Sequence, residues 1–272
     1  MKLKPSLKNL QPYLLNIILI WVIIYFYKTL PYYKNFLRSE TQSVLFYLAI
    51  TYTILAIPFY LFKEQKQKSK GEEILNLFYK IFTFKFSKTT KKEKTQFLFI
   101  LVKIFFTPIM INFVLNNYFY LKSNLHIFSN LSSLLTIEGF NYVIFPVTLG
   151  LIFFIDTLWF AFGYLAEAGF LKNKIRSVEP TFLGWFVALI CYPPFNSYAV
   201  NGINLFGFPI KGINWFANEH VLFSTDTTTF IFRIAIIILL GIYVSATLAL
   251  GTKCSNLTNR GIVSRGPYKY VR

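Results

Sequence analysis

The sequence predicts an all-α fold, a polytopic membrane helical bundle of about six transmembrane helices with both ends in the cytoplasm. Three observations predict it. Apolar residues make up 55% of the 272 residues and charged residues only 14%, whereas a soluble domain carries about 25% charged residues. Several apolar runs reach the roughly 20 residues that a helix needs to cross a bilayer. Basic residues lie mainly between these runs, so the net charge of +17 belongs to loops rather than to one soluble face.

The first two predicted spans are uninterrupted apolar runs without an acidic residue. The first is too long for a signal peptide's apolar region, and no small-residue cleavage pattern follows it, so we expect an uncleaved helix. The second ends before a polar run at residues 63–70. The six predicted spans cover residues 13–30, 44–62, 97–119, 140–165, 182–199 and 230–250.

The later spans carry polar residues or prolines. The third contains Lys103 and Pro108, and the sixth is interrupted mainly by Arg233 near its start. In the fifth, Pro193 and Pro194 remove two backbone donors and disfavour helix immediately before them. We therefore expect a broken or kinked helix at the fifth span.

Lysine and arginine counts predict the orientation, because cytoplasmic loops carry an excess of both. Residues 1–12 hold three, residues 63–95 hold ten, residues 172–176 hold three and residues 253–272 hold five of the 28. Two predicted spans separate each pair of successive basic regions, so six spans place all four regions on one side. Five or seven spans would break this agreement. We expect a multi-pass protein of the bacterial inner membrane.

The basic connection after the second span has two interpretations. Apolar residues recur there at helical spacing with lysines on other faces, which favours a short helix in the cytoplasmic interface, near anionic head groups. The alternative is a positively charged connector that only fixes orientation. On the opposite side, residues 196–230 are rich in Asn, Gly and aromatics and are expected to be ordered against the membrane surface. The apolar positions of the connection are Ile74, Leu77, Phe78, Ile81 and Phe82, and the lysines are Lys80 and Lys85.

Two acidic residues lie within or just after the fourth span. A carboxylate near the bilayer centre, such as Asp156, costs roughly 2.5 to 3.5 kcal/mol unless it is paired or neutral. Glu167 follows three helical turns later, which places both on one helix face about 16 Å apart, too far for a carboxylate pair. Asp156 is a candidate for a substrate or proton path, and Glu167 for a headgroup or cofactor contact. The alternatives are a helix–helix hydrogen bond for Asp156 and a salt bridge with Lys103 for Glu167.

Metal, covalent and nucleic-acid chemistry are not indicated. His126 and His220 are far apart in sequence, so no metal site is predicted, and two cysteines make no disulfide framework. Neither Cys191, among apolar residues, nor Cys254, beside Lys253, is predicted to act as an activated thiolate. Nucleic acid is excluded as a partner by the distribution of the basic residues between apolar runs.

Residues 251–272 are basic and contain several glycines. By chemistry alone they are typical of a juxtamembrane flank that binds lipid. The order of residues is more specific, because it closely resembles the opening of the catalytic part of the isoprenylcysteine carboxyl methyltransferase family and its phospholipid methyltransferase relatives. The resemblance covers only about the last 20 residues. It is carried by Asn256-Leu257-Thr258, Arg260-Gly261 and Arg265-Gly266-Pro267-Tyr268-Lys269-Tyr270-Val271-Arg272.

The resemblance implies the N-terminal part of an integral membrane methyltransferase that uses S-adenosylmethionine on a lipophilic substrate. In that family the corresponding run leads into His-Pro and further helices that build the donor pocket. Because the chain stops at Arg272, we expect a fragment or an interrupted reading frame that is inactive as given. By position, the resemblance implies donor-pocket roles for Arg272, Tyr268, Tyr270 and Arg265, with interfacial anchoring as the alternative for the tyrosines.

Two other functions remain open at this point. Sterol reductases share a related C-terminal pattern, which would make the chain part of a membrane enzyme that uses NADPH. A non-enzymatic membrane protein or transporter would use Asp156, with residues 251–272 as a basic flank only. The methyl acceptor and the oligomeric state are not indicated by the sequence.

Overall fold

The computed structural model describes residues 10–62, 69–124, 135–167, 171–193, 195, 203–205, 208–210 and 225–270. The chain divides into two compact units, Met1–Asn112 and Phe113–Arg272. The fold is all-α except for two short strand pairs among the described residues.

Five helical stretches are long and apolar enough to cross a membrane. This confirms the predicted membrane helices at five of six positions and indicates a multi-pass integral membrane protein. The five are built on α1 (Leu10–Thr29), α3 (Ser39–Phe62), α5 (Lys91–Asn124), α8 (Phe145–Leu165) and α11 (Asp226–Leu250). A short α7 (Ile137–Gly139) and a π-helical turn η4 (Phe140–Ile144) precede α8.

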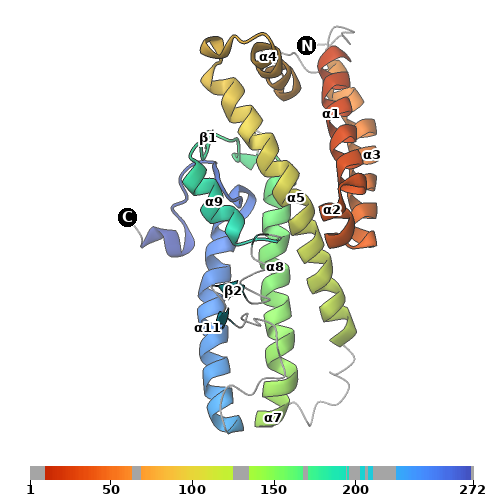
Figure 1. Ribbon diagram of the computed structural model, residues 1–272. Helices are drawn as coiled ribbons and strands as arrows, with labels where there is room; N and C mark the ends of the chain where they lie inside the picture. The colour runs from red at the N-terminus through yellow and green to blue at the C-terminus, as the bar shows by residue number, and fades with distance from the viewer. Residues whose placement is uncertain are drawn as a thin grey trace. The chain divides into compact units, whose positions relative to one another are not determined.

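In the first unit, α1 and α3 lie side by side and antiparallel (Figure 1). Thr53 joins them at two points, since its carbonyl accepts from the Tyr13 hydroxyl at 2.9 Å and its Oγ1 accepts from the Trp21 indole at 3.2 Å. The short helix α2 (Pro31–Phe36) connects α1 to α3, and α4 (Lys70–Phe82) and a 3₁₀ turn η2 (Phe86–Lys88) follow α3 before α5 begins.

Pro108 lies inside α5, and its missing N–H explains the hydrogen bonds of two tyrosines in the first unit. A proline has no N–H, so the carbonyl of Ile104, four residues earlier, loses its helical partner. The hydroxyls of Tyr27 and Tyr33 donate to this carbonyl at 2.9 and 3.1 Å. An otherwise unsatisfied backbone oxygen therefore becomes the point at which α1 and α2 are held to α5.

In the second unit, α8 and α11 run side by side (Figure 1). After α8, strand β1 (Ser177–Val178) pairs antiparallel with β4 (Thr258–Asn259), which joins this connection to the end of the chain. Helix α9 (Phe182–Ile190) follows β1, and β2 (Ile203–Leu205) pairs antiparallel with β3 (Phe208–Ile210). After α11 come the 3₁₀ turns η6 (Gly251–Lys253) and η7 (Gly266–Lys269) on either side of β4.

The fifth predicted span is not a long helix in the described residues. Helix α9 has nine residues, which at 1.5 Å per residue reach about 14 Å, less than half of a bilayer core. The Thr181 hydroxyl caps its start by accepting from the Gly184 N–H at 3.2 Å, and Cys191 and Tyr192 are no longer helical. The prolines expected to break this helix follow directly. Most of the predicted ordered stretch at residues 196–230 lies outside the described residues.

Candidate functional site

The terminal segment, residues 251–270, is folded against the helices of the second unit and is not an extended flank. Its η7 turn packs on α11, and its start packs on the end of α8. Gly163 of α8 makes the close approach possible, because a Cβ there would overlap the carbonyl oxygen of Cys254. The buried Cys254 thiol donates to the Thr247 carbonyl of α11 at 3.4 Å.

Asn256 links the terminal segment to two other elements of the second unit. Its backbone N–H donates at 2.6 Å to the hydroxyl of the fully buried Tyr164, at the end of α8. Its side-chain amide donates at 2.7 Å to the hydroxyl of Tyr192, just after α9. One asparagine thus joins α8 to the end of α9.

Arg260 lies inside the protein at 3% exposure. Its Nη1 is 3.5 Å from the carbonyls of Ala166, Asn173 and Thr252, and its Nη2 has no hydrogen-bond partner among the described residues. Burial lowers the pKa of the Arg260 guanidinium, while the negative charge of Glu167 raises it. A cation beside the carbonyl end of α8 is favourable, since helix C-termini carry partial negative charge.

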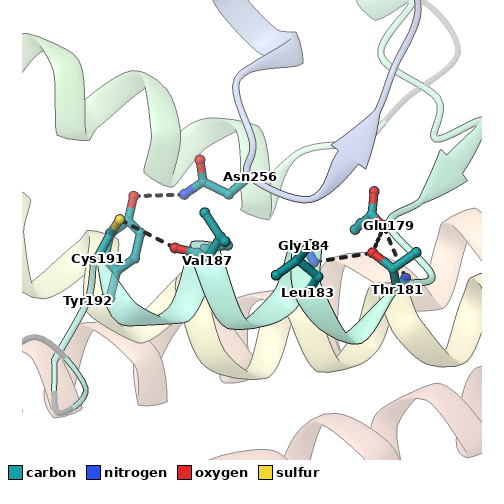
Figure 2. Close-up of a pocket in the computed structure, with 9 residues that line it drawn as sticks. Glu179, Thr181, Leu183, Gly184, Val187, Cys191, Tyr192 and Asn256 are labelled. Atoms are coloured by element: carbon teal, nitrogen blue, oxygen red, sulfur yellow. Dashed lines mark hydrogen bonds between the residues drawn. The ribbon is translucent and has the colours of Figure 1, made fainter.

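A cleft of about 550 Å³ lies along α9. Asn256 reaches over the helix from the terminal segment, Glu179 and Thr181 stand at its start, and Cys191 and Tyr192 at its end (Figure 2). The Thr181 N–H and hydroxyl both donate to the Glu179 carboxylate, and these hydrogen bonds lower the pKa of Glu179. The remaining lining, from α9, is Leu183, Gly184, Val187 and Ala188. The cleft therefore combines an apolar wall with polar groups at both ends.

The predicted donor-pocket residues lie on the η7 side of the terminal segment. Arg265 is exposed, but its Nε donates at 2.7 Å to the Ala249 carbonyl at the end of α11. Burial raises the pKa of Tyr268, which lies near Cys254. Tyr270 is 83% exposed, and Arg272 lies outside the described residues. Arg265, Tyr268 and Tyr270, the described members of this set, do not line the cleft along α9.

Gly266 fixes how η7 lies on α11. Its φ of +59° belongs to the left-handed region, which glycine adopts without steric cost. A Cβ on Gly266 would also stand 2.7 Å from the Cβ of Ala249. Both constraints select glycine at this point of the resembling run.

Asp156 is buried between α8 and α11 and forms hydrogen bonds across them. Its carboxylate accepts from the Thr247 hydroxyl at 2.6 Å and from the Tyr243 hydroxyl at 3.2 Å. This is the geometry of the helix–helix hydrogen bond that was one of its two predicted roles. Among the described residues, no cationic side chain forms a salt bridge with Asp156.

Glu167 does not share a helix face with Asp156, which corrects the prediction from spacing. Helix α8 ends at Leu165, and Ala166 is extended, so the helical periodicity stops before Glu167. The Asn173 amide donates at 2.8 Å to the Ala166 carbonyl where the chain turns. The structure brings Glu167 near Arg260.

Several residues of this region were not predicted from the sequence. Asn256 and Arg260 stand in the run that carries the family resemblance, which is a signal that could have identified them. Tyr164, Asn173 and Tyr192 have no such signal, because only the fold brings them to the terminal segment. No group of three His, Cys, Asp or Glu residues that could hold a metal occurs in the described part of the chain, and His126 and His220 lie outside it.

Comparison of this chain with known protein families, with curated proteins and with solved structures gives no match. The assignment of a function therefore depends on the residues of the terminal segment and on their place in the fold.

Proposed function

We propose that this chain is the membrane-embedded N-terminal part of an S-adenosylmethionine-dependent methyltransferase that acts on a lipophilic substrate. The observation that carries the proposal is the folded terminal segment. The residues that resemble the methyltransferase family are packed on α8 and α11, where Asn256 and Arg260 hold them through partly or fully buried hydrogen bonds. A basic flank that served only to attract lipid would not need Arg260 inside the protein.

The described residues fit one edge of a donor site. Arg265 and Tyr270 are exposed side chains on one short turn, and they offer a guanidinium for a carboxylate and an aromatic face for a base. When bound, S-adenosylmethionine supplies a methyl group that is already activated by its sulfonium. The chain's own residues then have to position the reactants and exclude water. The anchoring of Arg265 to Ala249 fixes the position of this edge relative to α11.

The cleft along α9 is the place that suits an apolar substrate. Its wall is formed by an apolar helix whose lining side chains face outward, with Leu183 at 69% and Val187 at 54% exposure. In a bilayer such a helix can admit a lipid-bearing molecule from the side. The polar groups at the two ends, Glu179 and the pair of Asn256 and Tyr192, would then contact its polar part.

The proposed topology has six crossings with both ends in the cytoplasm. Five crossings are the long helices, and the sixth uses α9 together with the residues that follow it before α11. This arrangement keeps the basic regions at residues 63–95 and 253–272 on one side, as the distribution of lysine and arginine requires. It places the donor edge in the cytoplasm, where a polar donor is available.

The test is donor binding measured by titration calorimetry on the detergent-purified product of the whole reading frame, including any codons after Arg272. Binding of S-adenosylmethionine, weakened about tenfold by Arg265→Ala or Tyr270→Ala, is the expected result. The exposed neighbour Lys269→Ala is the matched control and should bind normally. If residues follow Arg272, a chain cut there should not bind, because the resemblance places most of the pocket beyond it.

Two outcomes would replace the proposal. Consumption of NADPH by the whole reading-frame product, without donor binding, would select the reductase. Loss of solute flux in Asp156→Asn, with no change on removal of residues 251–272, would select a transporter. A folded product that binds no donor, whether or not residues follow Arg272, contradicts the methyltransferase.

A further inference from the structure

Helix α4 and the turn after it present an apolar, aromatic surface together with a belt of lysines. We propose that this surface, here called the α4 face, lies on an anionic lipid headgroup layer and anchors the first unit to it. The proposal is independent of the methyltransferase proposal, because every residue that carries it belongs to the first unit. The apolar members of the α4 face are Leu75, Phe78, Tyr79, Phe82 and Phe84, and its exposed lysines are Lys85, Lys88, Lys91 and Lys94.

The inner side of α4 is already occupied by protein. Ile74 and Leu77 are 3% and 5% exposed, and the Gly71 N–H donates to the Asn16 side chain of α1 at 3.1 Å. A Cβ at Gly71 would stand 2.8 Å from the same Asn16 oxygen, so α4 begins in close contact with α1. The apolar residues that the sequence grouped on one helix therefore divide between two sides. Those on the outer side remain exposed although they are apolar.

The outer side is aromatic, as is typical of a membrane interface. Phe82 and Phe84 are 78% and 85% exposed, and Tyr79 is 62% exposed. The Lys85 ammonium lies 5.8 Å from the centre of the Tyr79 ring, which keeps a cation beside the apolar surface. Aromatic side chains with lysines next to them are enriched where a chain meets the headgroup layer.

The position of Phe84 is a second, independent observation. The N–H groups of Phe84 and Lys85 donate to the carbonyls of Ile81 and Lys80 at 3.0 and 2.8 Å, which closes α4 by a Schellman motif. Glycine is the usual residue at this point, because the motif needs a left-handed backbone. Phe84 adopts it with φ of +55°, which is sterically unfavourable for a residue with a Cβ. An aromatic ring is thus held outward at an energetic cost, as is common at functional surfaces.

The acidic residues of this region are turned inward, so the α4 face is positive. Glu73 and Glu93 are buried and pair with Lys92 and Lys80 at 2.8 and 2.7 Å. Glu72 is used in the capping box that starts α4, where its carboxylate accepts from the Ser69 N–H at 2.5 Å. With the carboxylates engaged, the exposed lysines are the charges that meet the surroundings. Charge complementarity selects an anionic surface, and the connection of α4 to α3 and α5 places that surface at the bilayer.

Spin-label accessibility on the full chain in lipid nanodiscs tests the position of the α4 face. In a Cys191→Ser background, labels are placed singly at Phe82→Cys, Phe84→Cys and, as a reference for the hydrocarbon, at Leu55→Cys in α3. In nanodiscs containing phosphatidylglycerol, we expect the spin labels at positions 82 and 84 to be more accessible to oxygen than to a water-soluble nickel complex. The label at position 55 should show this preference more strongly. Equal access to the nickel complex in all lipids would mean that the surface faces water. Protection from both quenchers would mean that protein covers it. Either result overturns the proposal.

The role of the lysines is tested by the composition of the lipids that stay bound to the purified chain. The triple variant Lys85→Gln, Lys88→Gln, Lys91→Gln should lower the ratio of phosphatidylglycerol to phosphatidylcholine bound to the purified chain by on the order of tenfold or more. Replacement of the same three lysines by arginine is the matched control and should preserve the ratio. An unchanged ratio in the glutamine variant, measured by mass spectrometry of the retained lipids, contradicts an anionic surface as the partner.

Discussion

The carbonyl oxygen of Cys254 occupies the space into which a side chain at Gly163 would extend. The contact joins the end of α8 to the start of the terminal segment, and it has no tolerance for an added methyl group. Backbone atoms cannot rotate away as a side chain can, so any larger residue at position 163 must move the segment.

Gly163→Ala should therefore loosen the terminal segment. We expect destabilisation of about 1 to 3 kcal/mol from overpacking, seen as a lower melting temperature in detergent and as faster tryptic cleavage after Lys253 and Arg265. Gly241→Ala is the matched control, because a Cβ there would meet nothing within 4 Å. Equal behaviour of the two variants would contradict the tight contact.

Tyr164→Phe should destabilise the second unit by removing the acceptor of the Asn256 N–H. A buried donor left without a partner costs about 1 to 3 kcal/mol, so the melting temperature should fall by a few degrees. Tyr270→Phe, at an 83% exposed position, is the control for stability and should have no effect. A melting temperature in Tyr164→Phe equal to that of the parent chain would show that the hydrogen bond contributes nothing.

Asp156→Asn should leave the fold intact, because the amide oxygen still accepts a hydrogen bond from Thr247. Asp156→Ala removes the acceptor and should lower the free energy of unfolding more than Asp156→Asn does. In a double-mutant cycle with Thr247→Ala, the coupling free energy between α8 and α11 should be about 0.6 to 1.7 kcal/mol, as for other hydrogen bonds between membrane helices. Zero coupling by thermal or denaturant unfolding would mean that the two side chains do not interact.

The two cysteines should differ sharply in reactivity. Burial raises the pKa of the Cys254 thiol to about 12, so at pH 8 it is protonated and enclosed, whereas Cys191 is exposed. Maleimide at pH 8 should label Cys191 alone in the folded chain and both after denaturation. Since the folded pKa is raised above the usual 9.0, the preference for the neutral thiol stabilises the fold below pH 9 and is lost as pH rises toward 12. Cys254→Ala should remove this part of the alkaline instability.

Topology can be measured with single exposed cysteines in the Cys191→Ser background. Six crossings predict that Ser87→Cys and Ser264→Cys are both labelled only after the inner membrane is opened, whereas Thr225→Cys is labelled from outside. Ser87 lies in the basic connection, and Thr225 and Ser264 lie beyond the two ends of α11. Labelling of Ser87→Cys and Ser264→Cys from opposite sides would establish an odd number of crossings between them.

The sequence by itself determined the membrane class and five of the long helices, because hydrocarbon requires about 20 apolar residues and a helix to satisfy the backbone. It also identified the place where α9 stops, since Pro193 and Pro194 act locally. These features depend on neighbours in sequence or on composition alone.

Only the tertiary structure decided which polar groups meet. Periodicity placed Glu167 on the face of Asp156, but Ala166 leaves the helix and Glu167 lies near Arg260. The two sides of α4 could not be separated from spacing, because the inner side is defined by packing on α1, far away in sequence. The partners of Asn256, Tyr164 and Tyr192, are 92 and 64 residues away from it. Such contacts depend on how the helices pack, and side-chain chemistry along a single chain does not specify them.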